Sequence, residues 1–561
     1  MLTSPALLLV VGAGIVALLD GRARRVVMVA LPLAALALLW SMPEGLGVTY
    51  DVIGFELTPV RIDALSRLFA TGFIVAGLLT SIYALHLDDR LQQSVILAYA
   101  GTAVGGALAG DLLSLFVWWE LAGLSSTFLI WAGRTERSYR AGMRYLVAQL
   151  ISGLLMLAGI AWRVMDGKGL EFSYLGLDGP GEMLILLAIG LKCAFPVLHA
   201  WVVDTYPEAT VVGTVALSPF TTKLAVYALA RAFAGTEGLV VVGVLMAIFP
   251  IFYAVIENDL RRVLAYSMIN QLGFMVAGVG IGGELGINGA AAHAVADMIF
   301  KGLLFMAMGA VLLRAGTVKG SDLGGLYKSM PQTTVLCIIG AASISAVPLF
   351  SGFVTKSIIM EAVAEEHHTV FWLLLLFASA GVFHHAGIKI PYFAFFAHDR
   401  GYKVKEAPLN MRVAMTLGAT ICFGIGVLPG LFYQLLPYEM DYVPYTSYHV
   451  INQVQLLLLA SMAFTVLIRT GLYPPEIRSI NIDADWLYRR GLPATVRAGS
   501  RVLVATGRTL AAPRRRAVDR FLDVTANWFT PNGPIAFPWP THVMVWWVAL
   551  LFGVVLAVAL L

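Results

Sequence analysis

Apolar runs of about 20 residues follow one another nearly end to end along this chain. A helix needs about 20 apolar residues to cross the hydrocarbon core of a bilayer, so each run is long enough to span it. Only 13% of the 561 residues are charged, against roughly 25% in soluble domains. The alternation of apolar and polar residues that is typical of barrel strands is absent. The sequence therefore predicts an all-α polytopic membrane protein.

We predict about sixteen transmembrane helices. Their expected ranges are 3–19, 24–41, 62–86, 91–110, 111–132, 141–165, 182–200, 209–232, 237–256, 263–281, 288–313, 333–361, 370–397, 410–436, 449–470 and 542–561. The first run lacks the basic n-region of a signal peptide, so we expect a retained helix there. With the N-terminus placed outside, basic residues gather in the inner loops, as the positive-inside rule requires. These features predict a multi-pass protein of the cell (inner) membrane.

Composition divides the chain further. We expect N-terminal transmembrane helices at 1–90, a first repeat at 91–232, a second repeat at 237–397, C-terminal core helices at 410–470, a basic cytoplasmic or interfacial segment at 471–541 and a final transmembrane helix at 542–561. Within the basic segment, about 494–528 mixes arginines with apolar residues, which favours a helix lying on the membrane surface. A solvated basic connector would have the same composition.

Several ionisable residues fall inside the predicted spans, where a charge costs about 2.5–3.5 kcal/mol on insertion scales. Four fall near the middle of a span, namely Glu120, Lys192, Lys223 and Lys301. Lys356 lies in the second half of a broken span, and Lys389 lies nearer the inner end of its helix. Such residues indicate either an ion pathway or structural pairs. For Glu120 the best candidate partner is Lys192, and their pair could respond to a single proton. A static buried ion pair that fixes helix packing is the alternative.

Two predicted helices are interrupted by proline, at Pro196 and at Pro348, and each carries a lysine near its break. Lys192 and Lys356 are 164 residues apart, and Lys223 and Lys389 are 166 apart. The two lysines of each pair lie five helices apart, and an odd number of helices gives the second repeat the opposite orientation across the membrane. Broken helices in corresponding places are typical of inverted repeats in transporters. We therefore predict two inverted five-helix repeats.

His293, Asp297 and Lys301 are spaced at i, i+4 and i+8, so they share one helix face. Such a stripe could pass protons through intervening water, or it could act as polar glue between helices. His385 lies on the face of Lys389 and could join the pathway or simply sit at an interface.

Cofactor and metal sites find no support in the sequence. The three cysteines, Cys193, Cys337 and Cys422, are scattered through apolar runs without metal-ligand spacing. We expect buried thiols and neither a cofactor nor a metal. The net charge of +4 is small, and nothing predicts nucleic acid binding.

Five stretches together resemble the proton-translocating antiporter-like subunits of complex I, membrane-bound hydrogenases and Mrp-type multisubunit cation/proton antiporters. They are Phe116–Leu121, Gly190–Ala209, Asp259–Ser267, Phe300–Phe305 and Pro348–Lys356. Within this family, Tyr206–Ala209 and Thr222–Lys223 look like the D-type subunit of Mrp antiporters. One departure stands ahead of Lys301, where the family usually has Asn-His-Ala and this chain has Ala296-Asp297-Met298.

The resemblance implies roles for individual residues. Glu120 and Lys192 would be the family's acid–lysine pair, Lys223 and Lys301 central lysines on a hydrated axis, and Lys356 the group after the second break. The aspartate at 297 puts a direct transfer of the family's relay role there in doubt. The basic segment and last helix exceed the usual D-type subunit and are similar to the lateral helix of the longest complex I subunit, which suggests contact with neighbouring membrane subunits.

The sequence thus predicts a proton-conducting subunit of a multisubunit monovalent cation/proton antiporter, with Na⁺ or K⁺ as the exchanged ion and no enzymatic activity of its own. A redox-driven pump subunit, of a complex I-like or hydrogenase assembly, would share every motif. An independent solute carrier would need a substrate pocket. An enzyme or scaffold for inorganic carbon uptake would need a nucleophile–base or metal-ligand arrangement, which the chain does not offer.

Overall fold

The computed structural model describes residues 4–52, 54–478, 481–528, 530, 533 and 540–560. These residues are mostly helical and form two compact units, Met1–Asp485 and Trp486–Leu561. The boundary between the units falls inside the segment predicted at 471–541. Residues 479, 480, 529, 531, 532 and 534–539 of that segment lie outside the described residues, as do 1–3 and 561 at the predicted first and last spans.

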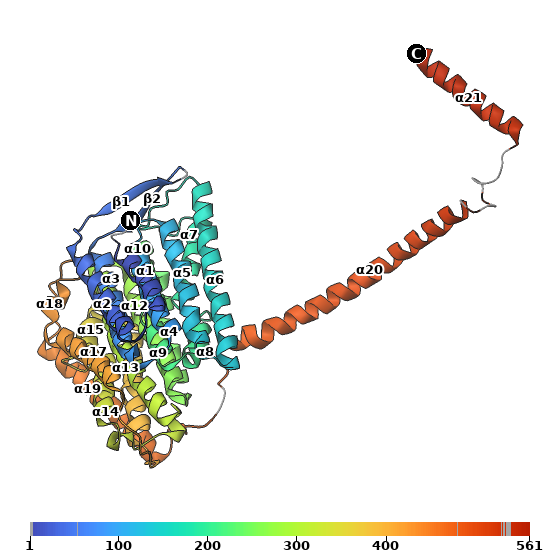
Figure 1. Ribbon diagram of the computed structural model, residues 1–561. Coiled ribbons are helices and arrows are strands. Elements are labelled where there is room, and N and C mark those ends of the chain that lie inside the picture. Colours follow the sequence, from blue (N-terminus) through green and yellow to red (C-terminus); the bar gives the residue numbers. More distant parts are fainter. Residues whose placement is uncertain are drawn as a thin grey trace. The chain divides into compact units, whose positions relative to one another are not determined.

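The first unit is a bundle of helices with one β-hairpin (Figure 1). Its helices and strands are α1 (Pro5–Leu18), α2 (Gly21–Ser41), β1 (Gly47–Val52), β2 (Phe55–Arg61), α3 (Ala64–Tyr83), α4 (Arg90–Leu108), α5 (Leu112–Trp131), α6 (Glu136–Met165), α7 (Pro180–Lys192), α8 (Ala200–Thr205), α9 (Val211–Leu217), α10 (Thr221–Ala232), α11 (Gly238–Ile256), α12 (Leu260–Ile281), α13 (Gly283–Ala315), α14 (Pro331–Ile344), α15 (Ser351–Glu365), α16 (Thr369–Val382), α17 (Leu409–Val427), α18 (Pro429–Tyr433) and α19 (Ser447–Thr470). Two π-helical segments, Phe383–Lys389 and Tyr392–Phe396, continue α16.

Eleven helices of the described residues are long and apolar enough to cross a membrane. Each coincides with one of the sixteen predicted spans, so the multi-pass membrane architecture is confirmed. The other five predicted spans are 3–19, 91–110, 182–200, 333–361 and 542–561. Two of these are split by helix breaks, and the terminal two form shorter apolar helices. The helix α4 at 91–110 has the length but is less apolar.

The second unit contains α20 (Leu492–Trp528) and α21 (Thr541–Leu560). The expectation of a helix at about 494–528 is therefore confirmed by α20. Its polar and apolar residues alternate with the helical period, and its described side chains are mostly exposed. Such a helix is typical of an interfacial element, and its position on a membrane surface stays a prediction.

Two helices, α12 and α13, form the centre of the bundle, and the most apolar stretch of each is almost wholly buried. The helix α12 packs closely against α11. A Cβ atom on Gly243 of α11 would lie 2.4 Å from the Ala277 nitrogen, and one on Gly273 of α12 would lie 2.4 Å from the Ala247 nitrogen. These reciprocal contacts bring the two backbones together, as small residues do in membrane helix pairs.

Both predicted helix breaks are present and have the same backbone geometry. The first lies between α7 and α8, where Ala194 and Val197 have φ of 62° and 71°. The second lies between α14 and α15, where Ala346 and Leu349 have φ of 57° and 75°. Left-handed conformations are costly for residues with a Cβ, so a pair at the same spacing in both breaks indicates a shared local structure.

The positions of the lysines relative to the breaks differ from the expected equivalence. Ala346 and Leu349 follow Ala194 and Val197 by 152 residues (346 − 194 and 349 − 197), whereas Lys192 and Lys356 are 164 apart. Lys192 ends α7 before its break, and Lys356 lies in α15 after its break. The spacing of the lysines alone therefore pairs residues that are not equivalent in the two breaks.

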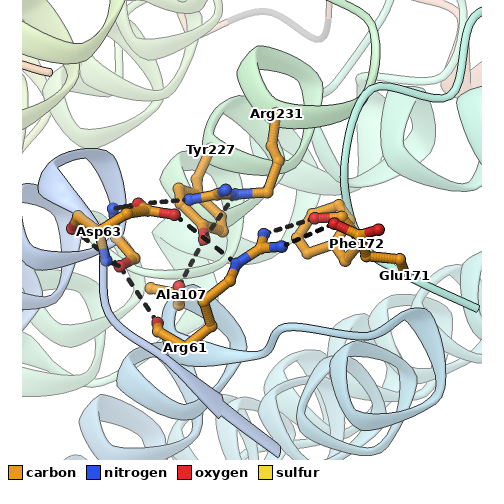
Figure 2. Close-up of polar contacts among 8 residues, drawn as sticks. Arg61, Asp63, Ala107, Glu171, Phe172, Tyr227 and Arg231 are labelled. Atoms are coloured by element: carbon orange, nitrogen blue, oxygen red, sulfur yellow. Dashed lines mark hydrogen bonds and ion pairs between the residues drawn. The ribbon is translucent and has the colours of Figure 1, made fainter. Parts of the chain in front are cut away.

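The β1–β2 hairpin was not expected from the sequence. It is antiparallel and rests on the ends of α4 and α5, where the Thr58 amide donates to Asp111 at 2.9 Å. Next to it, Arg231 at the end of α10 donates to Asp63 at 2.7 Å and to the Tyr227 hydroxyl at 3.0 Å, while Arg61 donates to the Phe172 carbonyl (Figure 2). This cluster fixes the end of α10, the helix that carries Lys223.

We expect loss of Asp63 to loosen this end of the bundle. Burial raises the pKa of Asp63, but the hydrogen bond and charge of Arg231 outweigh it and hold the pKa below its usual value. The stabilisation is therefore present above pH about 4 and is lost as the pH falls through the folded pKa. Asp63 also caps α3. Asp63→Ala should cost about 1–2 kcal/mol, seen as a lower unfolding temperature in detergent.

The matched variant Asp63→Asn separates the two contributions, because asparagine caps a helix as well as aspartate does. It should keep the cap, lose the charge, and fall between the alanine variant and the natural chain at neutral pH. Equal unfolding temperatures for all three proteins would contradict this account.

Candidate functional site

Glu120 is positioned by α5 and is half-buried. Its Oε1 atom is enclosed and has no hydrogen-bond partner among the described residues. The carboxyl group lies against Gly153 of α6, where a Cβ atom would come within 1.7 Å of Oε1. The absence of a side chain at 153 therefore leaves the room that the carboxyl group occupies.

Lys192, the last residue of α7, is buried, and its Nζ donates to the Trp119 carbonyl at 2.6 Å. The same ammonium lies 4.5 Å from the centroid of the Trp119 ring, a favourable cation–π arrangement. Trp119 is in turn held by a hydrogen bond from Nε1 to Ser152 at 2.9 Å.

The expected contact between Glu120 and Lys192 is not a direct ion pair in the described structure. The two groups interact electrostatically, but the ammonium is bound to the carbonyl of the residue before Glu120. A carbonyl satisfies a buried ammonium without fixing the charge of the carboxyl group. The charge of each group still affects the protonation of the other, although no ion pair locks them together.

Lys223 forms an ion pair with Asp297, a partner that the sequence did not indicate. Nζ and Oδ2 are 2.6 Å apart, and both side chains are fully buried. The ammonium also donates to the Ser218 carbonyl at 3.0 Å, which is available because the chain breaks between α9 and α10. The other carboxylate oxygen, Oδ1, is buried without a hydrogen-bond partner among the described residues.

His293 and Lys301 also lie in α13, and both are fully buried. The imidazole bridges two helices, with Nδ1 3.0 Å from the Thr355 hydroxyl and Nε2 3.1 Å from Gln271 Oε1. Lys301 donates to the Ser267 hydroxyl of α12 at 2.9 Å. The three residues of the predicted stripe contact α10, α12 and α15, with His293 and Lys301 both bound to α12.

Lys356 in α15 is buried, and Nζ donates to the Ile344 carbonyl at the end of α14, at 3.1 Å. It lies 5.0 Å from the centroid of the Phe274 ring. Ile344 is the last residue before the second break, as Lys192 is before the first. The ammonium thus satisfies a carbonyl that the break leaves free.

Lys389 is buried in the π-helical segment and caps the end of α11. Its Nζ donates to the carbonyls of Ala254, Val255 and Glu257 at 3.2, 2.7 and 2.7 Å. The C-terminal end of a helix attracts a cation. Glu476 completes the site, with Oε1 2.9 Å from Nζ. His385 is buried nearby, and neither of its ring nitrogens has a hydrogen-bond partner among the described residues.

Sequence reasoning missed the acidic residues Glu476 and Asp483, which lie after the last core helix. Asp483 accepts a hydrogen bond from the Tyr266 hydroxyl at 2.7 Å and lies 3.1 Å from His199 Nε2. The signal was present, because both are acids in a segment otherwise rich in arginine.

Neighbouring members of this set interact electrostatically. Asp297 interacts with Lys301 and Lys356, and His293 interacts with Lys356, Lys301 and Lys223. His385 interacts with Lys301 and Lys389. These interactions connect one buried row of ionisable residues, with hydroxyl, imidazole and carbonyl groups between them. The row consists of Lys223, Asp297, His293, Lys301, Lys356, His385 and Lys389. Such a row can hold and transfer protons, because each amine or acid has a neutral and a charged form.

Residues 109–382 match the family described as the NADH:quinone oxidoreductase/Mrp antiporter transmembrane domain. This stretch, just under half of the chain, is similar to that domain. The match covers every residue of the row except His385 and Lys389, together with both helix breaks.

Several relatives are named as antiporter subunits. The chain is 29% identical over 434 residues to the A-type subunit of the Na⁺/H⁺ antiporter of Alkalihalophilus pseudofirmus, covering 68% of this chain and 53% of the relative. It is 26% identical to the D-type subunit from the same organism, covering 69% and 85%. The chain spans about half the length of the A-type relatives that it matches.

The fold is also similar to that of one chain in a solved assembly. A chain of the Mrp complex from Dietzia sp. DQ12-45-1b has a TM-score of 0.75 and 23% identity, covering 99% of this chain and 62% of that one. The likeness extends over both units of this chain.

Proposed function

We propose that this chain is the proton-translocating membrane subunit of a multisubunit monovalent cation/proton antiporter. The observation that carries the proposal is the row of buried ionisable side chains, most of them inside helices long enough to span a bilayer. Such groups are expensive at membrane depth and mark ion pathways and proton relays. The names of the relatives, which are A-type and D-type subunits of Na⁺/H⁺ antiporters, support exchange of a monovalent cation for protons.

In the proposed pathway, Lys192 holds a proton while Glu120 adjusts the proton affinity of that amine through its charge. Protons pass along Lys223 and Asp297, then Lys301 and His293, to Lys356 and Lys389. Asp297 replaces the family's usual histidine as a charge-bearing group, and its contact with Lys223 supports a part in the transfer. When a proton reaches Asp297, the ion pair opens and the Lys223 ammonium is free to release its own proton.

We further propose sixteen membrane crossings built on two inverted repeats, 91–232 and 237–397, followed by core helices at 410–470. The matched backbone geometry of the two breaks supports this layout. The positive-inside rule favours an external N-terminus and a cytoplasmic position for the basic segment. The protein would act in the cell membrane.

Other integral membrane subunits are the proposed partners. The most apolar part of α19 is only 6% buried, and its long apolar side chains face outwards, among them Leu458, Leu459 and Met462. Lipid or a neighbouring subunit would cover such a face. The amphipathic α20 could grip a neighbour in the same assembly.

A redox-driven complex is the second candidate, because the matched family is described by NADH:quinone oxidoreductase as well as by Mrp antiporters. The two candidates differ in the companion subunits. Purification in mild detergent should recover small antiporter subunits with this chain, whereas iron–sulfur subunits would favour the redox candidate.

Loss of Lys192 should stop ion exchange while the assembly remains intact. Proton transfer by a positioned side chain contributes about 10²–10⁴-fold to a rate, so Lys192→Ala should lower exchange by at least about 100-fold. The measurement is the collapse of a pH gradient on addition of NaCl or KCl to everted vesicles that hold the native assembly. Glu120→Ala should also abolish exchange.

The matched control is Lys328→Ala, which removes an exposed lysine paired with Asp399, outside the row. It should exchange at the natural rate. Retained exchange in Lys192→Ala, with equal protein in the membrane, would refute the assigned role.

A further inference from the structure

A strap that follows α19, described at residues 472–478 and 481–485, belongs to the first unit and crosses one end of the bundle. Tyr473 stacks on His384 with ring centroids 5.5 Å apart. Arg478 forms an ion pair with Asp322 at 3.0 Å, in the connection between α13 and α14. Further along, the Asn481 amide donates to Glu257 at 3.2 Å. The strap is thus attached at several points to the connections that follow α11 and α13.

One of its side chains contacts a member of the buried row, and a second contacts residues beside the row. Glu476 places Oε1 2.9 Å from Lys389 Nζ. Asp483 accepts from Tyr266 at 2.7 Å and contacts His199 at 3.1 Å. Tyr266 directly precedes Ser267, the hydroxyl partner of Lys301. The two carboxyl groups therefore stand at two separate places where the row approaches the end of the bundle.

The strap has anchors other than these two carboxyl groups, namely the exposed ion pair of Arg478 and the stacked ring of Tyr473. Burying an acid beside another acid is costly. Glu476 has Glu257 as a charged neighbour as well as Lys389, and neither of its carboxylate oxygens has a hydrogen bond of good geometry among the described residues. Burial raises the pKa of Glu476, although the charge of Lys389 opposes this shift.

Both acids also keep a small contact with water. The side chain of Glu476 is 6% exposed and that of Asp483 is 9% exposed, whereas Lys389 is fully buried. Each carboxyl group is therefore an outer neighbour of a buried base. On the proposed orientation, this end of the bundle faces the cytoplasm.

We infer that Glu476 and Asp483 are the proton-exchanging residues at the inner mouth of the conduction row, Glu476 toward Lys389 and Asp483 toward His199 and Tyr266. A carboxylate takes a proton from water and passes it to the neighbouring neutral base, which becomes charged while the carboxylate is restored. The same steps run in reverse when protons leave. This inference rests on the proposed function, because it needs a conduction row to serve.

The test compares isosteric with charge-conserving variants of the full chain in its native assembly, in everted vesicles. Glu476→Gln and Asp483→Asn should each lower cation-driven proton exchange at least about tenfold. Glu476→Asp and Asp483→Glu should retain at least about a third of the rate, although they change the side-chain length. A purely steric role predicts the opposite order.

A second readout separates proton transfer from charge balance. When exchange is measured in H₂O and D₂O, the residual rate of Glu476→Gln should be limited by proton transfer, so its isotope ratio should rise above that of the natural chain. Arg478→Gln, which removes the exposed anchor of the same strap, should leave both the rate and the isotope ratio unchanged.

The inference is overturned if the amide variants exchange at the natural rate, if their isotope ratio stays unchanged, or if Arg478→Gln lowers exchange as much as they do. Lys301→Ala, measured in the same vesicles, distinguishes failure of the proposed function. Natural exchange in Lys301→Ala would refute conduction by the row, whereas loss there with natural exchange in Glu476→Gln refutes only the role of the strap.

Discussion

Replacing Asp297 with leucine is expected to abolish ion exchange and to lower the stability of the chain by about 3–5 kcal/mol, the usual cost of removing one partner of a buried ion pair. Among the described residues, Lys223 would then keep only the Ser218 carbonyl as a partner. A buried ammonium without a counter-charge must lose its proton or draw in water. The measurements are the unfolding temperature in detergent and the exchange rate in vesicles.

The matched control is the double variant Lys223→Met with Asp297→Leu. Two apolar groups of similar size can replace a buried ion pair at little cost, so this variant should recover most of the stability and none of the exchange. The pair would be a structural feature alone if the double variant exchanged ions. It would have no importance for folding if Asp297→Leu unfolded at the natural temperature.

A methyl group on Gly153 is expected to reduce exchange about 100-fold although it changes no ionisable residue. The new Cβ atom would come within 1.7 Å of Glu120 Oε1, so the carboxyl group must move. A misplacement of about 1 Å can cost on the order of 100-fold in a reaction that depends on position. The stability should change little, because the obstructing atoms belong to the end of a flexible side chain.

Gly302→Ala supplies the control for this prediction. Gly302 is a buried glycine of α13, next to Lys301, and a Cβ atom there meets no described atom within 4 Å apart from its chain neighbours and the backbone of its own helix. This variant should exchange at the natural rate. Equal rates for Gly153→Ala and the natural chain would show that the position of Glu120 against α6 is not important.

The helices, the buried thiols and the two helix breaks followed from local sequence. A run of about 20 apolar residues has few alternatives to a membrane helix, and Pro196 and Pro348 each remove a backbone donor. Cys193, Cys337 and Cys422 are buried, as expected of thiols in apolar runs. The burial of Lys192, Lys223, Lys301 and Lys356 could likewise be predicted from their places in the spans.

The partners of those lysines could not be predicted. Lys192 binds a carbonyl beside Glu120, Lys223 binds Asp297 on another helix, and Lys389 caps α11 and meets Glu476. Most of these contacts join residues far apart in the chain, and several use backbone carbonyls, which every residue carries. No pattern of side chains along one helix identifies such a partner.

The sequence by itself determined that this chain lies in a membrane, where its helices break and which charges it buries, because the cost of placing polar groups in hydrocarbon acts on each segment separately. Only the tertiary structure decided which charges meet. The close approach of helices at small residues such as Gly153, Gly243 and Gly273 sets the neighbours of each helix, and a buried ion then takes whichever oxygen that packing brings within reach.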